Sequence, residues 1–352
     1  MVEGSAVRTV PVDGPPRAGW PIRLNGIGRR REGTAVLDDI HLELPAGMIV
    51  AVVGESGCGA STLARIVAGR ERPDRGEVRI DGRTRPDAPP VVAVPHRFSP
   101  RWRRARDTIV PRAQRAHAEA HQEMERLLDL VGLEHREERA RRLSRGDRQR
   151  LAIARALFAR PRALVLDDAL SFLHTSARER VRDAVVRELR RRGTTTLWAT
   201  RDTAEAVAVA DRVVVLHRGR VAAEGSPEQV YARAAEPAVA AVLGPVNAVP
   251  GIVEGAVVDV WGQHVPLAGP AHDGHCEVLV RPQNVVLVAS DAPGMDAVVE
   301  ESTFLGSVRR SLVRTTDGSL VQVDHAVTDR LDDHARVRIA LAPVPVTTRP
   351  LG

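Results

Sequence analysis

The stretch GESGCGAST, residues 54–62, decides the fold of the first part of this chain. The apolar run MIVAVVG, residues 48–54, precedes it and has the composition of a strand buried on both faces, while a helix is expected over roughly 60–70. The spacing of residues 54–62 matches the phosphate-binding loop G-x-x-x-x-G-K-[ST]. In that loop, glycines let backbone N–H groups wrap phosphates and the helix N-terminus adds its dipole. We therefore expect a phosphate cradle between this strand and this helix.

The cradle lacks the cation of that pattern, because Ala60 occupies the lysine position. Ser61 keeps the hydroxyl that would ligate Mg²⁺. Losing one charge-assisted phosphate contact costs about 1.5–3 kcal/mol, or roughly 10- to 150-fold in nucleotide affinity. The predicted nucleotide-binding residues are Gly54, Glu55, Ser56, Gly57, Cys58, Gly59, Ala60, Ser61 and Thr62.

Length and composition allow two globular domains in this chain of 352 residues. Hydrophobic residues make up 43% and aromatic residues only 3%, so the core is expected to consist mostly of Ala, Val and Leu. No apolar run approaches the roughly 20 residues of a membrane span, and the N-terminus has no signal-peptide pattern. We expect a soluble, cytoplasmic protein that meets a membrane only through a partner. Cys58 and Cys276 predict neither a metal site nor a disulfide framework.

The basic residues are all arginine: the sequence contains no lysine, and the combined count of 51 is arginine alone. A net charge of +6 brings nucleic acid into consideration as a partner. Arginines cluster at 101–106 and 136–150, but neither cluster has the aromatic residues interleaved in single-strand binders. A solvated face, or contact with another protein subunit, is the favoured interpretation.

The chain reads as a tail and two domains. Residues 1–20 are rich in Pro and Gly and predict a flexible tail. An alternation of strands and helices then predicts an α/β domain over 21–242. Its expected strands are 37–47, 48–54, 77–82, 90–96, 163–168, 194–200 and 212–221, and its expected helices are 60–70, 111–131, 144–159, 175–192 and 202–209.

After Val242 the composition changes to short β runs separated by Gly, Pro and Asp-Gly turns. Runs at 277–282, 284–290, 307–325 and 335–341 predict strands, and TTDGSLVQV within the third of these indicates a hairpin. We therefore predict a second, all-β domain over 243–352.

The segment LSRGDRQRLAIARALFARPRALVLDDALSFLH, residues 143–174, carries a family resemblance. It resembles the ABC transporter ATPases, in which an LSGGQ signature precedes a helix with Gln-Arg and Ala-Arg-Ala-Leu, followed by a strand ending in Asp-Glu. The C-terminal segments GPVNAVPG (244–251), VRPQNVVLV (280–288) and TFLGS (303–307) are similar to the transport-associated OB-type domain of importers. The expected fold is an α/β P-loop NTPase domain of the ABC ATPase type, followed by a small all-β OB-like domain.

The resemblance assigns roles to positions that differ from the family pattern. Ser144, Arg145, Gly146 and Asp147 stand where the signature lies, with Arg145 and Asp147 replacing its glycine and glutamine. In the family, the signature of one subunit contacts the γ-phosphate held by the other. An arginine side chain would crowd that approach, and an aspartate would repel phosphate.

Four further positions follow from the same resemblance. Asp167 keeps the Mg²⁺-associated carboxylate, whereas Asp168 replaces the glutamate that acts as general base and is a weaker candidate base. Arg201 stands in place of the switch histidine, and His96 in place of the Q-loop glutamine. Arg31 falls where an adenine-stacking aromatic residue usually lies, although a guanidinium can also stack on a base.

The resemblance implies the ATP-binding subunit of an importer for a small solute or ion, with ATP and Mg²⁺ as cofactors. Its implied partners are transmembrane permease subunits, a second copy or another ABC ATPase subunit, and indirectly a solute-binding protein, at the cytoplasmic face of the cell membrane. Because the altered positions act together, we expect weak or absent ATP hydrolysis. The alternative is a non-hydrolysing pseudo-ATPase that serves a permease or an active paralogue. A nucleic-acid-associated member of the superfamily is a third interpretation, which the OB-type domain disfavours.

Overall fold

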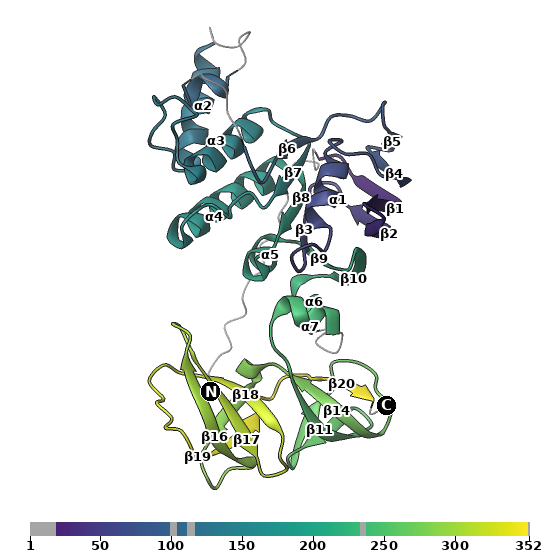
Figure 1. Ribbon diagram of the computed structural model, residues 1–352, viewed down its shortest axis with the longest axis vertical. Helices are drawn as coiled ribbons and strands as arrows, with labels where there is room; N and C mark the ends of the chain where they lie inside the picture. Colours follow the sequence, from purple (N-terminus) through teal and green to yellow (C-terminus); the bar gives the residue numbers. More distant parts are fainter. Residues whose placement is uncertain (1–18, 99–103, 111–116, 233–236, 351–352) are drawn as a thin grey trace, which may run out of the picture. The chain divides into compact units, whose positions relative to one another are not determined.

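The computed structural model describes residues 19–98, 104–110, 117–232 and 237–350. The chain forms two compact units, one ending at Val221 and the other beginning at Ala222 (Figure 1). The first unit is α/β and the second is mostly β, as predicted. The tail at 1–18, the arginines at 101–103 and the start of the helix expected at 111–131 lie outside the described residues. The domain boundary after Val242 remains a prediction.

The first unit is built on a sheet with the strand order β10-β9-β3-β8-β7-β6. Pairing is parallel between β3 and β8, β3 and β9, β8 and β7, and β7 and β6. Every residue of β3, β7 and β8 is buried, in accordance with their continuous apolar runs. The strands are β3 (Ile49–Val53), β6 (Val92–Val94), β7 (Ala163–Asp167), β8 (Thr195–Thr200), β9 (Arg212–His217) and β10 (Arg220–Gly225).

One sequence-based expectation in this sheet is wrong. The run 212–221 is two strands, β9 and β10, rather than one. Arg218 and Gly219 separate them, and both have positive φ values, 48° and 77°. Successive residues in the left-handed region reverse the chain tightly, so the strand cannot continue through them.

A second, antiparallel sheet has the order β2-β1-β4-β5. Its strands are β1 (Ile22–Arg31), β2 (Thr34–Leu44), β4 (Arg75–Ile80) and β5 (Arg83–Thr84). Buried residues alternate with exposed ones along β2, as for a half-buried strand. Its buried side chains share one hydrophobic core with β3 and with the helix that follows β3.

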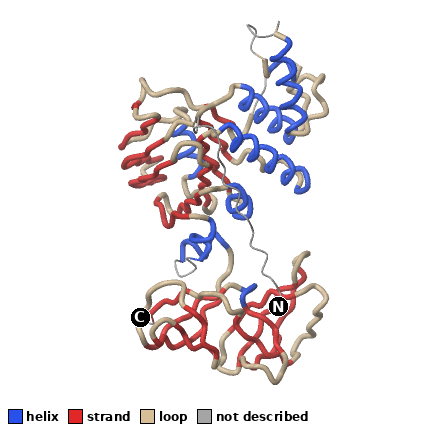
Figure 2. The backbone as a smooth tube through the Cα atoms, turned by 180° about the vertical axis from the view of Figure 1, so that it is seen from behind, coloured by secondary structure: helices blue, strands red, loops and turns tan. Residues whose placement is uncertain are grey.

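The first unit contains helices α1 (Ala60–Val67), α2 (Ala118–Leu130), α3 (Arg145–Phe158), α4 (Thr175–Arg192) and α5 (Thr203–Val209), and the short 3-10 helix η1 (Arg106–Thr108). Figure 2 shows that α2 and α3 lie together on the far side of the parallel sheet from the antiparallel strands. Helix α1 packs against β7 and β8. In the described part of the chain, no helix is long and apolar enough to cross a membrane.

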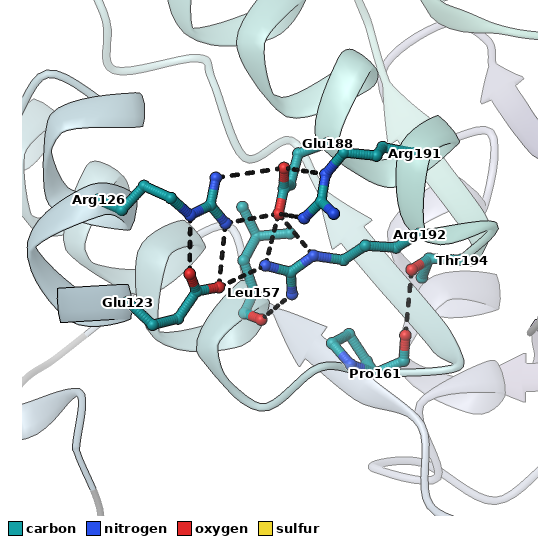
Figure 3. A network of polar contacts seen from close by, with 8 residues as sticks. All are labelled: Glu123, Arg126, Leu157, Pro161, Glu188, Arg191, Arg192 and Thr194. Atoms are coloured by element: carbon teal, nitrogen blue, oxygen red, sulfur yellow. Dashed lines mark hydrogen bonds and ion pairs between the residues drawn. The ribbon is translucent and has the colours of Figure 1, made fainter. Parts of the chain in front are cut away.

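Ion pairs join α2 to α4 around Glu188, whose side chain is only 5% exposed (Figure 3). Arg126 of α2 and Arg191 of α4 donate to its carboxylate at 2.7 and 2.8 Å. Arg192, also on α4, reaches back to Glu123 of α2 at 2.8 Å. Burial by itself raises the pKa of Glu188, but the surrounding guanidinium groups lower it to about 2. The carboxylate is therefore charged at neutral pH and ties the two helices together.

The second unit includes the end of β10, then the helices α6 (Pro227–Ala232) and α7 (Pro237–Leu243), and continues as two five-stranded sheets. Their orders are β13-β12-β11-β14-β20 and β15-β19-β16-β17-β18. Valines dominate the core between them, consistent with the low aromatic content. The strands are β11 (Asn247–Glu254), β12 (Val257–Val260), β13 (Gln263–Pro266), β14 (Gly274–Val280), β15 (Val285–Val288), β16 (Met295–Phe304), β17 (Arg309–Thr315), β18 (Leu320–His325), β19 (Arg336–Leu341) and β20 (Thr347–Pro350), with the 3-10 helix η3 (Pro282–Asn284) between β14 and β15.

The predicted hairpin is present: β17 and β18 pair antiparallel on either side of the Asp-Gly turn. The runs predicted at 277–282, 284–290 and 335–341 correspond to β14, β15 and β19. Arg281, only 4% exposed, connects this β domain to its preceding helices. It donates to the carbonyls of Leu243, Gly244 and Tyr231 at 3.1–3.2 Å. Both cysteines are buried free thiols.

Candidate nucleotide site

The site forms where three neighbouring parallel strands end. Because β3, β8 and β7 are adjacent and parallel, their carboxyl ends meet at one edge of the sheet, where ligands bind in open α/β folds. The loop after β3, the acidic pair at the end of β7 and Arg201 after β8 line one cavity of about 310 Å³. Arg31, Val36, Ala199 and Thr200 complete its lining.

The predicted loop requires glycine at particular positions. Gly57 and Gly59 have φ values of 89° and 105°, in the region that side chains with a Cβ avoid. A Cβ at Gly59 would also lie 2.7 Å from the carbonyl oxygen of Val36, and one at Gly54 would lie 2.3 Å from that of Leu216. Helix α1 starts at Ala60, so the last three residues of the loop belong to its first turn. Its first N–H groups have no partner within the helix, which makes this end suited to an anion.

Ser61 and Asp167 form the centre of the cavity's polar side. The hydroxyl of Ser61 donates to Oδ1 of Asp167 at 2.7 Å. Asp167 is only 7% exposed, and burial raises the pKa of its carboxyl, against the effect of the Ser61 hydrogen bond. A buried carboxylate beside a hydroxyl, next to a phosphate-binding loop, suits Mg²⁺, which takes one or two carboxylates together with substrate phosphates. No group of three or more His, Cys, Asp or Glu side chains forms a metal cage within the described residues.

Asp168 contacts two basic side chains. Its Oδ2 atom lies 3.1 Å from Nδ1 of His96 and 3.8 Å from the nearest guanidinium nitrogen of Arg201. The His96 nitrogen is buried and makes no hydrogen bond in this arrangement. Asp168 itself has a positive φ of 51°, and its N–H donates to the carbonyl of Ala199 at 2.8 Å. The backbone conformation therefore fixes the position of Asp168 in the chain, and its carboxylate lies beside His96 and Arg201.

His96 connects this carboxylate to the signature region. Its ring packs against Phe172 at 5.1 Å between centroids, and the guanidinium of Arg145 lies 5.7 Å from the centre of the same Phe172 ring. Gln149 of α3 donates to the His96 carbonyl at 3.0 Å. A chain of contacts therefore runs from Arg145 through Phe172 and His96 to Asp168. Arg145, Phe172 and His96 line a second hollow of about 140 Å³, whereas Asp168 lines the loop cavity.

The signature residues cap a helix. Ser144 is the N-cap of α3, and its Oγ accepts from the Asp147 N–H at 3.0 Å. The Ser144 hydroxyl donates in turn to the Asp147 carboxylate at 2.8 Å. Gly146 lies close to the Phe172 carbonyl, at 3.1 Å from where a Cβ would stand. None of the four signature residues lines the loop cavity.

The structure therefore unites most, but not all, of the predicted site. The loop residues, Asp167, Asp168 and Arg201 share one cavity, and His96 joins them through Asp168. The signature residues lie elsewhere in the unit. Phe172 and Val36 belong to the surroundings of the site, but neither was among the predicted site residues. Their proximity results from tertiary packing between distant segments.

Arg31 lines the cavity, but its guanidinium is already engaged. It donates to both carboxylate oxygens of Glu71, at 3.0 and 2.8 Å. Arg29 and Arg65 donate to the same carboxylate. Burial raises the pKa of Glu71, but hydrogen bonds from Arg65, Arg31 and Arg29 outweigh it and bring the value to about 2. The sequence gives no signal for this cluster, because Glu71 is distant along the chain from two of its partners.

Comparisons with known proteins agree with this architecture. The family model of the ABC transporter matches residues 37–171, and that of the TOBE domain matches residues 278–346. An Fe(3+) ions import ATP-binding protein, FbpC, of Streptomyces coelicolor is 40% identical over 300 residues, covering 81% of this chain and 84% of that protein. A sulfate/thiosulfate import ATP-binding protein of Chromobacterium violaceum is 33% identical over 319 residues, covering 86% and 87%.

A third relative, the spermidine/putrescine import ATP-binding protein PotA of Nitratidesulfovibrio vulgaris, is 31% identical over 335 residues and covers 84% of this chain and 87% of that protein. Among solved structures, the dimeric ATP-binding cassette MJ0796, in a post-hydrolysis state bound to ADP and Pi, superposes with a TM-score of 0.53. It is 23% identical and covers 58% of this chain and 98% of that one, which shows the fold of the first unit. The chain therefore belongs to the ATP-binding proteins of ABC transporters, of the importer type that carries a TOBE domain.

Proposed function

We propose that this chain binds ATP with Mg²⁺ and couples nucleotide binding to a membrane permease that imports a small solute or ion, with little or no ATP hydrolysis. The observation that carries the proposal is the hydrogen bond between Ser61 and Asp167 inside a cavity lined by the whole loop 54–62. The relatives named above are import ATP-binding proteins for Fe(3+) ions, for sulfate/thiosulfate and for spermidine/putrescine. We therefore propose only the class of the imported solute, a small solute or ion.

The loop backbone and the start of α1 would hold the phosphates. Ser61 and Asp167 would hold Mg²⁺, which neutralises phosphate charge when bound. Asp167 is protected from solvent, so its carboxylate stays directed at this position rather than at water. Ala60 contributes no cation, and binding should consequently be weak.

The catalytic motifs are proposed to be degenerate. Asp168 is about one methylene shorter than the glutamate it replaces, and a displacement of about 1 Å can cost on the order of 100-fold in rate. Its Oδ2 atom also lies against His96 and Arg201, which would compete with an attacking water for it. Arg201 cannot exchange a proton as a switch histidine would, because a guanidinium stays protonated. Asp168 therefore serves as a weak base at best.

The runner-up function is a non-hydrolysing pseudo-ATPase that supports a permease or an active paralogue. The chain of contacts from Arg145 to Asp168 favours this second role, because these side chains contact one another rather than a substrate. Arg145 and Asp147 would also hinder a γ-phosphate presented by a partner subunit. Such a chain would serve as a structural subunit that senses nucleotide, and it would not hydrolyse ATP.

The assembly proposed for either role is the same. Two ATP-binding subunits, identical or different, would dock beneath transmembrane permease subunits on the cytoplasmic face of the membrane, with a solute-binding protein acting from the other side. Residues 21–242 are proposed as the ATP-binding domain, 243–352 as the OB-like domain, and 1–20 as a flexible tail. Neither arginine cluster is proposed to bind nucleic acid.

Calorimetric titration of the full chain with ATP, with and without Mg²⁺, tests the binding. Saturable binding that weakens without Mg²⁺ supports the proposal, and an Asp167→Asn variant should lose the Mg²⁺ dependence. Absence of binding at millimolar ATP would contradict it. A steady-state phosphate-release assay of the same preparation then separates the two roles, since measurable turnover excludes the pseudo-ATPase.

A further inference from the structure

The loop cavity contains two basic lining side chains among the described residues, Arg31 and Arg201. Arg31 donates two hydrogen bonds, of 3.0 and 2.8 Å, to the half-buried carboxylate of Glu71. Arg201 is 61% exposed, and its contact with Asp168 is 3.8 Å, longer than a hydrogen bond. Of these two cations, Arg201 is therefore the one that an incoming anion can recruit at low cost.

Arg201 also lies at the correct end of the cavity for a terminal phosphate. Its neighbour Asp168 directly follows Asp167, which is bonded to Ser61. In phosphate-binding loops this hydroxyl holds the Mg²⁺ that bridges the β- and γ-phosphates. Arg201 thus stands near the terminal phosphates, whereas Arg31 is tied to Glu71.

The loop itself lies within electrostatic reach of Arg201. Burial raises the pKa of the Cys58 thiol, backbone hydrogen bonds oppose that rise, and the positive charge of Arg201 opposes it further. Cys58 lies in the middle of the loop and lines the same cavity. The charge of the Arg201 guanidinium, which follows β8, therefore reaches the loop that lacks a cation of its own.

We propose that Arg201 supplies the positive charge on the terminal phosphate that Ala60 cannot supply, so that the cation of the loop has moved from helix α1 to the segment after β8. The inference rests on the proposed nucleotide binding and goes beyond the switch position assigned to Arg201. A planar guanidinium suits this role, because it can donate two parallel hydrogen bonds to a phosphate.

The arrangement implies an exchange of ion pairs. On binding, the γ-phosphate takes the Arg201 guanidinium from Asp168, and Asp168 keeps His96 as its basic neighbour at 3.1 Å. ADP has no γ-phosphate and gains little from this exchange. Arg201 should therefore set the preference for ATP over ADP, which a lysine at position 60, contacting both phosphates, would set less sharply.

Calorimetry of the full chain with ATP and with ADP, both with Mg²⁺, tests this inference. Arg201→Ala should raise the ATP dissociation constant by about 10- to 100-fold and the ADP constant far less. Arg187→Ala is the charge-matched control, because Arg187 is exposed on α4 and lies outside the cavity lining. It should bind ATP like the unmodified chain. Thermal unfolding followed by circular dichroism checks that each variant is folded.

A rescue variant makes the test specific. Adding Ala60→Lys to Arg201→Ala returns a cation to the original position of the loop and should restore most of the ATP affinity. If Arg201→Ala binds ATP as tightly as the unmodified chain, or loses ATP and ADP equally, the inference is wrong. If the unmodified chain binds neither nucleotide, the proposed function fails instead.

Discussion

Nδ1 of His96 lies 3.1 Å from Oδ2 of Asp168, although the two residues belong to different motifs and are far apart in the sequence. Their proximity follows from the sheet: β6 and β7 pair in parallel, His96 comes shortly after β6 and Asp168 directly after β7. Phe172 packs against the same imidazole, with the two ring centroids 5.1 Å apart. His96 and Asp168, which we propose depart from the family pattern, thus contact one another, and we propose that they changed together.

Single reversions are therefore expected not to restore hydrolysis. Asp168→Glu alone places a longer carboxylate against His96, and His96→Gln alone leaves a carboxylate that is too short. Residues that act as one unit have strongly non-additive effects on rate. We expect turnover far below the 1–10³ s⁻¹ typical of enzymes for the unmodified chain and for each of these variants. Steady-state phosphate release at saturating ATP measures this, and turnover in that range from the unmodified chain would refute the prediction.

Ala60→Lys should strengthen ATP binding. The new ammonium group would add a charge-assisted contact worth at most about 1.5–3 kcal/mol, or up to roughly 150-fold in dissociation constant, because the proposed contact of Arg201 supplies part of this charge already. Ala118→Lys, at the exposed start of α2, is a control that adds the same charge away from the cavity. Calorimetry on both variants decides the matter. Equal affinities for Ala60→Lys and the unmodified chain would show that position 60 does not limit binding.

The cluster in Figure 3 predicts a pH-dependent contribution to stability. The pKa of Glu188 is about 2 in the folded chain, below its unfolded value of about 4.3. A lowered folded pKa stabilises at pH values above the unfolded pKa, and this contribution is lost as the pH falls towards 2. Glu188→Gln should therefore lower the free energy of unfolding by about 3 kcal/mol at pH 7, and by progressively less in acid.

Urea unfolding at several pH values measures this effect. Glu179→Gln, at an exposed position of the same helix, is the matched control and should change little at any pH. A difference between Glu188→Gln and the unmodified chain that stays constant from pH 7 down to pH 3 would contradict the assignment.

The sequence predicts the elements of the site better than their contacts. The loop, its strand and its helix follow from a local pattern, because glycine spacing and apolar runs determine the conformation of the residues next to them. The meeting of this loop with Asp167 follows too, since the carboxyl ends of parallel strands share one edge. The hydrogen bond from Ser61 to Asp167 shows that the loop and the end of β7 do meet at this edge.

Contacts between side chains of separate segments could not be predicted. The pairing of Arg31 with Glu71 depends on how β1 meets the loop after α1, which no periodicity encodes. The stacking of His96 on Phe172 depends likewise on packing between two loops. The split of β9 from β10 did have a local signal, the dipeptide Arg218-Gly219, which an apolar run on either side concealed.

The arginine clusters are predicted not to form a nucleic-acid site. Arg104 and Arg106 both pair with Glu137, at 2.8 and 2.5 Å, and Arg136 pairs with Asp129 and with a second carboxylate of α2. These internal partners neutralise charge that phosphates would otherwise attract, so DNA or RNA should bind weakly and without sequence preference. Such binding falls steeply as salt rises and should vanish at physiological ionic strength.

Fluorescence anisotropy with several labelled oligonucleotides, titrated from low to physiological salt, measures this. Glu137→Gln releases Arg104 and Arg106 from their shared partner and should strengthen the low-salt binding of every oligonucleotide by a similar factor. A sequence preference, or submicromolar affinity at physiological salt, would instead mean that these arginines form a dedicated site. In that case contact with protein partners would no longer account for the clusters, because a surface that discriminates bases must present donors that are not already bonded to carboxylates.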